Sequence, residues 1–318
     1  MIVVVGAAAV DLIARRERFL AGTSNPAAIR WAPGGVGYRI WRRLPAPRLL
    51  LSAVGDDPAG RWLEKRIGKE AQRRLTRRAN ERARPGPRSG ARLLRLAPYA
   101  TACYCAFMES GRLLYGAADM AVIERGLTRA RLQAHLPSLG PADLLVLEAN
   151  LSPVLVGALL RQYAGLTRVV FEGVSVEKLL RHEPGLRDLY LLAVNQEEAR
   201  ALRGRVAPRG SGEQWVARFL RDRRIAHLLV PRGRRGVRLH TLSADGRVRA
   251  ASFAPTRVVR VSDSTGAGDR LLAALLARLP PAGAARRPGG PSGRALPAVR
   301  VLPAAMREVE KALEEGNL

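Results

Sequence analysis

The sequence predicts an α/β protein with a doubly wound, mostly parallel sheet, and three observations support this fold class. Short apolar runs recur along the chain, segments with helical periodicity lie between them, and 47% of the 318 residues are hydrophobic. Strands that alternate with helices form right-handed βαβ units, whose helices cover the sheet on both faces. The length allows one large domain or two small ones with a substantial core.

The apolar runs predict the strands in order. Residues 2–13 form one continuous run, β-branched at first and interrupted by glycine, which suits a strand buried on both faces of a parallel sheet. Comparable runs follow at 48–55, 143–150, 168–174, 189–195 and 227–233. Helical periodicity predicts helices at 58–67, 152–164, 197–204 and 212–222, and an amphipathic terminal helix at 304–316.

Two regions depart from this alternation. Residues 100–118 predict an antiparallel hairpin that turns at Glu109, Ser110 and Gly111, and residues 28–35 predict exposed, extended chain. Together they predict a small β lid with elements at about 12–33 and 98–118. Residues 72–95 carry nine Arg against one Glu, and residues 279–300 are rich in Pro, Gly and Arg. We predict irregular structure for both of these segments.

The chain is strongly basic, with 54 Lys and Arg against 27 Asp and Glu, a net charge of +27. This charge by itself suggests a nucleic-acid or anionic partner. However, only four of the cations are Lys and only 5% of residues are aromatic. We therefore interpret the arginines as solvated surface, with non-specific adhesion to nucleic acid at low salt and no specific nucleic-acid partner.

The cysteines and the hydropathy pattern favour a cytoplasmic location. Cys103 and Cys105 lie two residues apart on a predicted strand, so both point to one face, where a disulfide between them is awkward. We expect two reduced thiols in a reducing compartment. We see no signal peptide and no run of about 20 apolar residues, and expect a soluble protein without a membrane partner.

Several common chemistries lack their sequence motifs. The chain has no G-x-x-x-x-G-K-[ST] phosphate loop, and GGVG at 34–37 lacks the third glycine of a dinucleotide fingerprint. GTSNP at 22–26 has Pro where a nucleophile elbow needs Gly. The four histidines, at 135, 182, 227 and 240, have no metal-ligand spacing.

The segment SDSTGAGDRLLAAL, residues 262–275, carries the strongest candidate site. It leads from a predicted strand into a predicted helix, so Gly266, Ala267 and Gly268 would expose the free N–H groups of a first helical turn to an anion. Asp269 would then act as general base towards a hydroxyl that attacks a bound phosphoryl group. The alternative is a capped helix in which Asp269 only complements the dipole and the N-cap is Ser262, Asp263 or Ser264.

This segment occurs with four other motifs in a set order. They are GAAAVD at 6–11, APGGVG at 32–37, NQEE at 195–198 and GRRG at 233–236, followed by DSTGAGD at 263–269. The set resembles the ribokinase-like sugar kinases, the phosphofructokinase-B family, over about residues 1–278 and weakly across 66–98. The resemblance implies a ribokinase-like three-layer sandwich, with residues 1–318 as a single kinase domain and ATP as the phosphoryl donor.

The resemblance also implies roles for individual residues. Asp269 would be the catalytic base, and Gly266, Ala267 and Gly268 the anion hole. The sugar or nucleoside would be bound by Asp11, Asn25, Gly34, Gly35 and the residue at position 39. The nucleotide would be bound by Asn195, Glu198, Gly233, Gly236 and Thr265. Glu198 would reach Mg²⁺ through water, and Asp263 and Thr265 would bind a monovalent cation such as K⁺.

A narrower resemblance, to the pseudouridine kinases of this family, rests on further segments. These are GTSNP at 22–26, PGGVG at 33–37, LLSAVGDDP at 50–58, ADM at 118–120, EANLS at 148–152 and FEGVSVEK at 171–178. They imply ATP-dependent phosphorylation of the ribose 5′-hydroxyl of pseudouridine. Family members often pair into homodimers through the lid, so a second copy is an expected partner.

Three features depart from the family pattern. Arg39 stands where the family has an Asn that contacts the sugar, and Pro231 stands where the nucleotide strand has Ser or Thr. Residues 279–300 replace an Ala-rich helical segment that closes the adenine pocket. These departures motivate an alternative function, a catalytically impaired pseudokinase that binds nucleoside without turnover.

Overall fold

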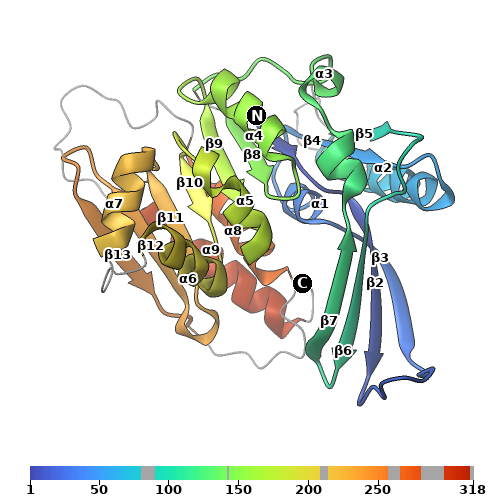
Figure 1. Ribbon diagram of the computed structural model, residues 1–318. Coiled ribbons are helices and arrows are strands. Elements are labelled where there is room, and N and C mark those ends of the chain that lie inside the picture. The colour runs from blue at the N-terminus through green and yellow to red at the C-terminus, as the bar shows by residue number, and fades with distance from the viewer. Residues whose placement is uncertain (80–89, 142, 208–213, 257–265, 281–296, 316–318) are drawn as a thin grey trace.

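The computed structural model describes residues 1–79, 90–141, 143–207, 214–256, 266–280 and 297–315. Its main feature is a nine-stranded sheet in the order β13-β12-β11-β10-β9-β8-β1-β4-β5 (Figure 1), parallel except for the antiparallel strands β12 and β13. This confirms the predicted doubly wound α/β fold. The strands are β1 Ile2–Val5, β4 Arg48–Val54, β5 Gly90–Arg95, β8 Leu144–Glu148, β9 Arg168–Glu172, β10 Leu191–Ala193, β11 His227–Pro231, β12 Val237–Leu242 and β13 Val248–Phe253.

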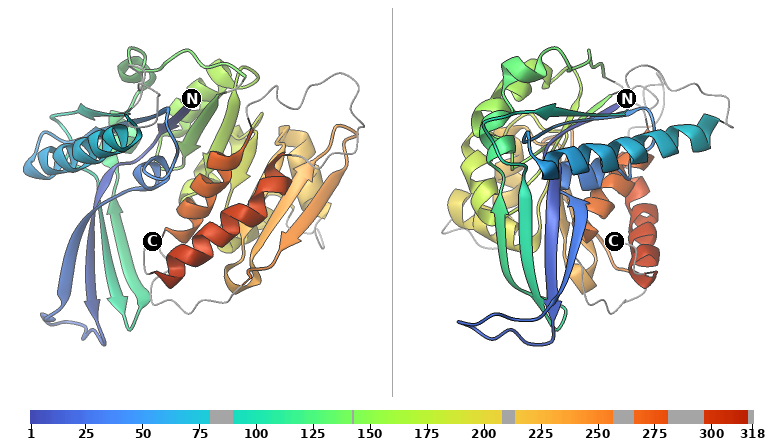
Figure 2. Two further views of the ribbon diagram at one scale, coloured as in Figure 1. Left: turned by 180° about the vertical axis from the view of Figure 1, so that it is seen from behind. Right: turned by 90° about the vertical axis from the view of Figure 1, so that its right-hand side faces the viewer.

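Helices cover both faces of this sheet and make the predicted three layers (Figures 1 and 2). One face is covered by η1 Val122–Gly126, α3 Arg129–Leu132, α4 Pro153–Tyr163, α5 Val176–His182, α6 Gln196–Val206 and α7 Gln214–Arg223. The other face is covered by α1 Val36–Trp41, α2 Pro58–Ala79, α8 Ala267–Arg278 and α9 Pro297–Glu314. Within the described residues, none of these helices is long and apolar enough to cross a membrane.

A second, four-stranded sheet in the order β3-β2-β6-β7 projects from the main body (Figure 2). Its strands are β2 Ala9–Arg16, β3 Ala28–Gly34, β6 Cys103–Glu109 and β7 Arg112–Asp119. The predicted hairpin is confirmed, because β6 and β7 pair antiparallel and the turn residues Ser110 and Gly111 have φ of 46° and 79°. Every residue of β7 is exposed.

The first predicted strand, residues 2–13, is wrong as a single element. The chain leaves the large sheet after Val5 and enters the small sheet at Ala9. At the break, the N–H of Ala7 donates to Glu148 Oε1 at 2.7 Å and that of Ala8 donates to Ser52 Oγ at 2.9 Å, instead of to a neighbouring strand. These side-chain acceptors satisfy the backbone of a buried corner, which an apolar run alone does not reveal.

Parts of both segments predicted as irregular are regular. Helix α2 continues to Ala79, because Arg, Ala, Gln and Leu are good helix formers and the next Pro after Pro58 is Pro85. Strand β5 pairs in parallel with β4, with Gly90 opposite Leu49. Helix α9 begins at residue 297 instead of 304. Residues 80–89 and 281–296 of these two segments lie outside the described part of the chain.

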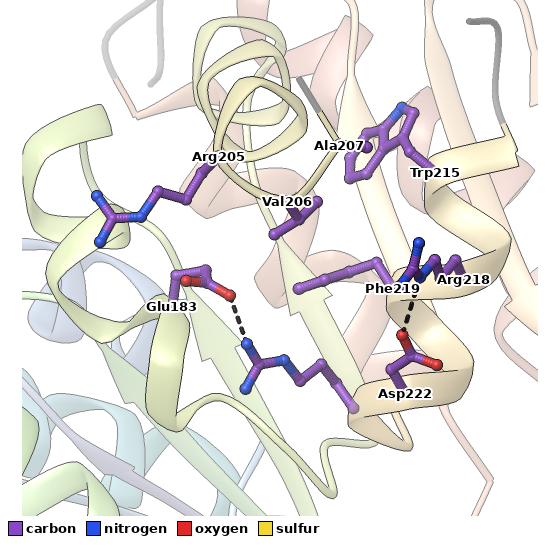
Figure 3. A pocket seen from close by; sticks show the side chains of 9 residues that line it. Glu183, Arg205, Val206, Ala207, Trp215, Arg218, Phe219 and Asp222 are labelled. Carbon is purple, nitrogen blue, oxygen red and sulfur yellow. Dashed lines mark hydrogen bonds and ion pairs between the residues drawn. The ribbon is translucent and has the colours of Figure 1, made fainter. Parts of the chain in front are cut away.

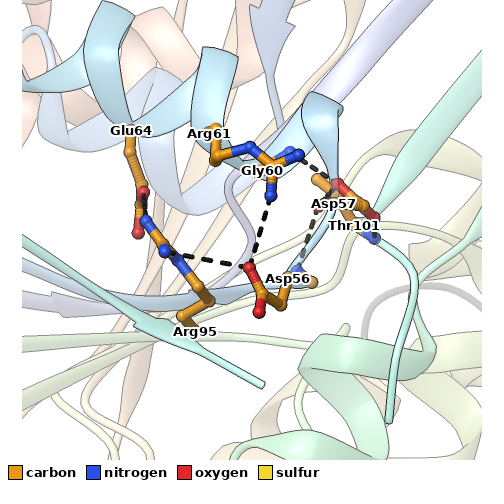
Figure 4. Close-up of polar contacts among 8 residues, drawn as sticks. Asp56, Asp57, Gly60, Arg61, Glu64, Arg95 and Thr101 are labelled. Carbon is orange, nitrogen blue, oxygen red and sulfur yellow. Dashed lines mark hydrogen bonds and ion pairs between the residues drawn. The ribbon is translucent and has the colours of Figure 1, made fainter. Parts of the chain in front are cut away.

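A cluster of hydrogen bonds around Asp57 joins the two sheets (Figure 4). The Asp57 carboxylate accepts from the N–H of Gly60 in the first turn of α2, at 2.7 Å. It also accepts from the N–H and the hydroxyl of Thr101, both at 2.7 Å. Because Thr101 lies two residues before β6, the Asp57 carboxylate fixes the small sheet to the start of α2.

Candidate active site

The candidate site lies where the direction of winding of the large sheet reverses. From β1 the chain passes to β4 on one side and later to β8 on the other. In open α/β sheets, ligands bind in the crevice outside the carboxyl ends of the strands at such a point. The candidate residues come from the corner after β1, from the starts of α1 and α8, and from the ends of β8 and β9.

Asp11 is held by the backbone of the adjacent strand. It lies in β2 opposite Ala32 of β3, and its side chain is only 5% exposed. A Cβ built on Gly34 would lie 2.1 Å from the carboxyl carbon and both oxygens of Asp11. Only glycine leaves room for the carboxylate there. The neighbouring Gly35 has φ 88°, and a Cβ on it would lie 2.5 Å from the carbonyl oxygen of Ala7. The GG pair therefore shapes this end of the site through backbone contact.

Asp269 lies in the first turn of α8. Gly266 is the N-cap of this helix in a left-handed conformation, φ 82°, which glycine adopts without strain. This corrects two expectations: Gly266 precedes the first helical turn, and the cap is neither Ser262, Asp263 nor Ser264. Ala267 and Gly268 do begin the helix, so the N–H groups of its first turn have no intrahelical partner. Asp269 is buried, with its side chain 9% exposed.

Arg39 connects the two predicted functional carboxylates. It lies in α1, its Nη2 donates to Asp11 Oδ2, and its Nη1 lies 3.6 Å from Asp269 Oδ2. Burial raises the pKa of Asp269 above its ordinary value, and Arg39 and then Arg43 oppose the rise. Burial likewise raises the pKa of Asp11, with Arg39 opposing it. The guanidinium therefore favours the charged form of both acids.

The structure adds two acids that we did not predict as site residues, one buried and one partly buried. Glu148 ends β8 and Glu172 ends β9, and both are next to the crevice. Burial raises the pKa of Glu172 well above its ordinary value, and the charges of Asp269, Glu198 and Glu148 raise it further. In the sequence, each of these residues is an acid at the end of an otherwise apolar strand. This pattern could have identified them, since a carboxylate is rarely buried without a partner or a function.

Glu148 has a complete set of partners. It accepts from the N–H of Ala7 at 2.7 Å and from the N–H and amide of Asn150 at 2.9 and 2.5 Å. Lys178 in turn donates to Asn150 Oδ1. Burial raises the pKa of Glu148 to about 7, and these hydrogen bonds limit the rise. The EANLS and FEGVSVEK segments therefore meet in one buried network that supports the corner after β1.

Asn195 and Glu198 form the N-terminal capping box of α6. The Asn195 side chain accepts from the N–H groups of Glu197 and Glu198, both at 2.9 Å, and Glu198 Oε2 accepts from the N–H of Asn195 at 3.0 Å. Burial, followed by the charges of Asp269 and Glu197, raises the pKa of Glu198 to about 7. Glu198 thus has a structural role in the cap and also faces the other acids.

These carboxylates fit a divalent cation that is held mainly by other groups. Within the described ranges, no set of three or more His, Cys, Asp and Glu is arranged to hold a metal ion directly. However, Glu172 and Glu198 repel each other and Asp269, which a nearby cation would relieve. Mg²⁺ keeps several waters and uses one or two carboxylates plus phosphates, which matches this donor set.

The remaining predicted residues are not all brought to this place. Asn25 lies in the loop between β2 and β3 and uses its whole carboxamide there: it accepts from Arg16 and Leu20 at 2.7 and 2.8 Å and donates to Leu20 and Thr23 at 2.8 and 3.0 Å. Its expected contact with the sugar or nucleoside stays a prediction. Gly233 begins the short turn η3 Gly233–Arg235 between β11 and β12, and Gly236 is its C-cap. Asp263 and Thr265 lie outside the described residues.

A separate pocket of about 320 Å³ lies between η2 Glu183–Gly185, α6 and α7 (Figure 3). Trp215 and Phe219 line it and belong to the core on the sheet face opposite α8. Glu183 at its edge is paired with Arg223 at 2.6 Å. The pocket contains none of the predicted catalytic or substrate-binding residues.

Comparison with known proteins identifies the family and the fold of the chain. The sequence model of the pfkB family carbohydrate kinases matches residues 119–285. A pseudouridine kinase from Escherichia coli (strain K12) is 27% identical over 282 residues, which cover 86% of this chain and 82% of that enzyme.

Solved structures share the fold. A carbohydrate kinase from Agrobacterium tumefaciens is 24% identical with a TM-score of 0.65, covering 96% of this chain and 89% of that one. An Arabidopsis thaliana ribokinase complexed with ribose and ATP is 16% identical with a TM-score of 0.69, covering 98% and 92%. At these identities the structures establish the fold alone.

Proposed function

Because the chain belongs to the pfkB family of carbohydrate kinases, we propose that it transfers the γ-phosphoryl group of ATP to a hydroxyl of a small sugar or nucleoside. The observation that carries this proposal is the buried Asp269 in the first turn of α8, beside N–H groups that have no intrahelical partner, with Asp11 of the small sheet nearby. One acid would hold the acceptor molecule and the other would take its proton.

The chemistry of transfer follows from the positions of Asp269 and of the free N–H groups at the start of α8. The acceptor oxygen attacks the γ-phosphorus in line, the bond from that phosphorus to the bridging oxygen breaks, and ADP leaves. Asp269 receives the hydroxyl proton, for which its raised pKa makes it a stronger base than a solvated carboxylate. The free N–H groups of Gly268 and its neighbours at the start of α8 stabilise negative charge on the phosphoryl oxygens.

Mg²⁺ supplies charge neutralisation of the phosphates when it is bound, and Glu198, with Glu172, would hold it through water. We further propose K⁺ near Asp263 and Thr265, and nucleotide contacts at Asn195, Gly233 and Gly236.

ATP and free thiols fit a cytoplasmic location, and Cys103 and Cys105 are unbridged with their sulfur atoms 3.7 Å apart. Two copies would pair through the exposed lid strands.

Pseudouridine is the acceptor that we propose, with its ribose 5′-hydroxyl as the reacting group. The 27% identity with the Escherichia coli enzyme supports this choice. So does the buried network of Glu148, Asn150 and Lys178, because its members come from two of the segments that resemble pseudouridine kinases.

The test is Asp269→Asn in an assay of ADP release with Mg²⁺, ATP and pseudouridine. We expect turnover to fall by about 10²- to 10⁴-fold, the usual worth of a general base, while binding of pseudouridine persists. Asp222→Asn is the matched control, since that exposed carboxylate only pairs with Arg218 at 3.4 Å. Undiminished turnover in Asp269→Asn contradicts the assignment.

A pseudokinase is the second candidate function, and the contact of Arg39 with both carboxylates favours it. It predicts that pseudouridine raises the melting temperature of the protein, whereas Mg²⁺ with ATP does not. Stabilisation by both ligands together with ADP release excludes this alternative.

A further inference from the structure

Arg39 occupies the centre of the proposed site in a way that matters for the order of binding. Its Nη2 donates to Asp11 Oδ2 and its Nη1 lies 3.6 Å from Asp269 Oδ2, while the arginine side chain is 18% exposed. One oxygen of each carboxylate is therefore taken by the guanidinium. These are the acids that, under the proposed function, must bind the acceptor and remove its proton.

The same side chain lies beside the place where the transferred phosphoryl group would arrive. A Cβ built on Gly266, the N-cap of α8, would lie 3.7 Å from Arg39 Cδ and 3.9 Å from Asp269 Oδ2. The N–H groups of α8 open next to this point. The Arg39 side chain thus lies next to both carboxylates and to the N-cap of α8.

The backbone that carries Arg39 is fixed, so only the side chain needs to move. Its N–H donates to the carbonyl of Gly35 at 2.9 Å, and its carbonyl accepts from Arg43 Nη1 at 2.9 Å. Each carboxylate makes one contact with the guanidinium. A phosphoryl group instead offers two parallel oxygens to the planar fork of an arginine, which is the stronger arrangement.

We propose that Arg39 is a catalytic residue that exchanges the two carboxylates for the γ-phosphoryl group when ATP binds. This inference rests on the proposed function. The exchange frees Asp11 and Asp269 for the acceptor hydroxyls and places a cation on the group whose charge builds up during transfer. The site is closed to the acceptor until the donor is present.

The first test separates the contact with the γ-phosphoryl group from any choice of acceptor. Affinities of the full chain for Mg²⁺ with AMP-PNP and for Mg²⁺ with ADP are measured by calorimetry for the wild type, Arg39→Asn and Arg39→Lys. We expect Arg39→Asn to weaken AMP-PNP by about 10- to 100-fold and ADP by less than about twofold, and Arg39→Lys to recover part of the loss. Equal weakening of both nucleotides, or none, overturns the proposal.

The second test measures coupling to the acceptor. In the wild type, AMP-PNP is expected to raise the affinity for pseudouridine by about tenfold or more, whereas Arg39→Asn binds pseudouridine without nucleotide and loses this coupling. Its kcat falls by about 10³-fold, the lower end of the effect of a transition-state arginine. Arg42→Asn is the control, because Arg42 is the C-cap residue of the same helix but pairs with Glu70 at 3.6 Å.

The outcomes of the two tests distinguish this inference from the function on which it rests. If no phosphorylated product forms but Arg39→Asn still loses AMP-PNP selectively, the acceptor assignment fails and the role of Arg39 stands. If product forms and Arg39→Asn keeps its kcat or its coupling, the kinase assignment stands and the role of Arg39 is wrong.

Discussion

Gly34→Ala tests the construction of the acceptor site most directly. The added Cβ would lie 2.1 Å from three atoms of the Asp11 carboxyl group, whereas ordinary contact begins at 3.4 Å, so the carboxylate must retreat by about 1.3 Å. The backbone of residue 34 requires no left-handed conformation, and the three atoms nearest to the new methyl group all belong to Asp11, so this contact dominates the strain.

The displacement acts on binding of the acceptor more than on the fold. A misplacement of about 1 Å in a positioning group costs about 10²-fold, so we expect kcat/KM for pseudouridine to fall by about this factor while KM for ATP stays within about twofold. The assay is ADP release with either substrate varied, together with the melting temperature to establish that the variant is folded.

A matched glycine provides the control. Gly68 lies in α2, where a Cβ would meet nothing within 4 Å, so Gly68→Ala should leave kcat/KM unchanged and stabilise the helix by up to about 1 kcal/mol. If Gly34→Ala retains wild-type kcat/KM for the acceptor, Asp11 does not bind the substrate from this position, and the reasoning is refuted.

Two further predictions concern stability. Asp57→Ala removes the acceptor for Gly60 and Thr101 and should lower the free energy of unfolding by about 1–2 kcal/mol. The control is Asp56→Ala, which should cost less than about 0.5 kcal/mol because the Asp56 side chain is 47% exposed. Equal losses of the two variants in urea unfolding contradict this prediction. Burial lowers the pKa of His227 to about 4, so the unfolded chain alone binds this proton between pH 6.5 and 4, and stability falls on acidification through that window. Between pH 7 and 5, the free energy of unfolding of His227→Gln should therefore fall by about 2 kcal/mol less than that of the wild type. An identical fall in the two proteins excludes His227 as the cause.

Much of the architecture could be predicted from local patterns. The runs at 48–55 and 227–233, for example, became β4 and β11 because a strand buried on both faces must be apolar along its whole length. The hairpin at Ser110 and Gly111 followed from residues that tolerate positive φ. The start of α8 followed from a cluster of small residues before an apolar helix.

Other elements depended on partners distant in sequence. The break after Val5 is stabilised by Glu148 and Ser52, and β5 exists as an edge strand because β4 offers it free backbone groups. Neither interaction has a signal within the segment itself. The composition of residues 72–95 alone therefore predicts irregular structure.

At the site, the residue types and their order can be read directly from the sequence: the glycines at 34 and 35, the acid at 269 and the departure at Arg39. Only the tertiary structure decided that Arg39 spans Asp11 and Asp269, and that Glu172 and Glu198 face the same crevice. It also placed Asn25 in the loop between β2 and β3, with its carboxamide bonded to Leu20. The physical reason is that the energy of a charge depends on the atoms within a few ångströms of it, and residues 28 to 258 positions apart along the chain supply those atoms here.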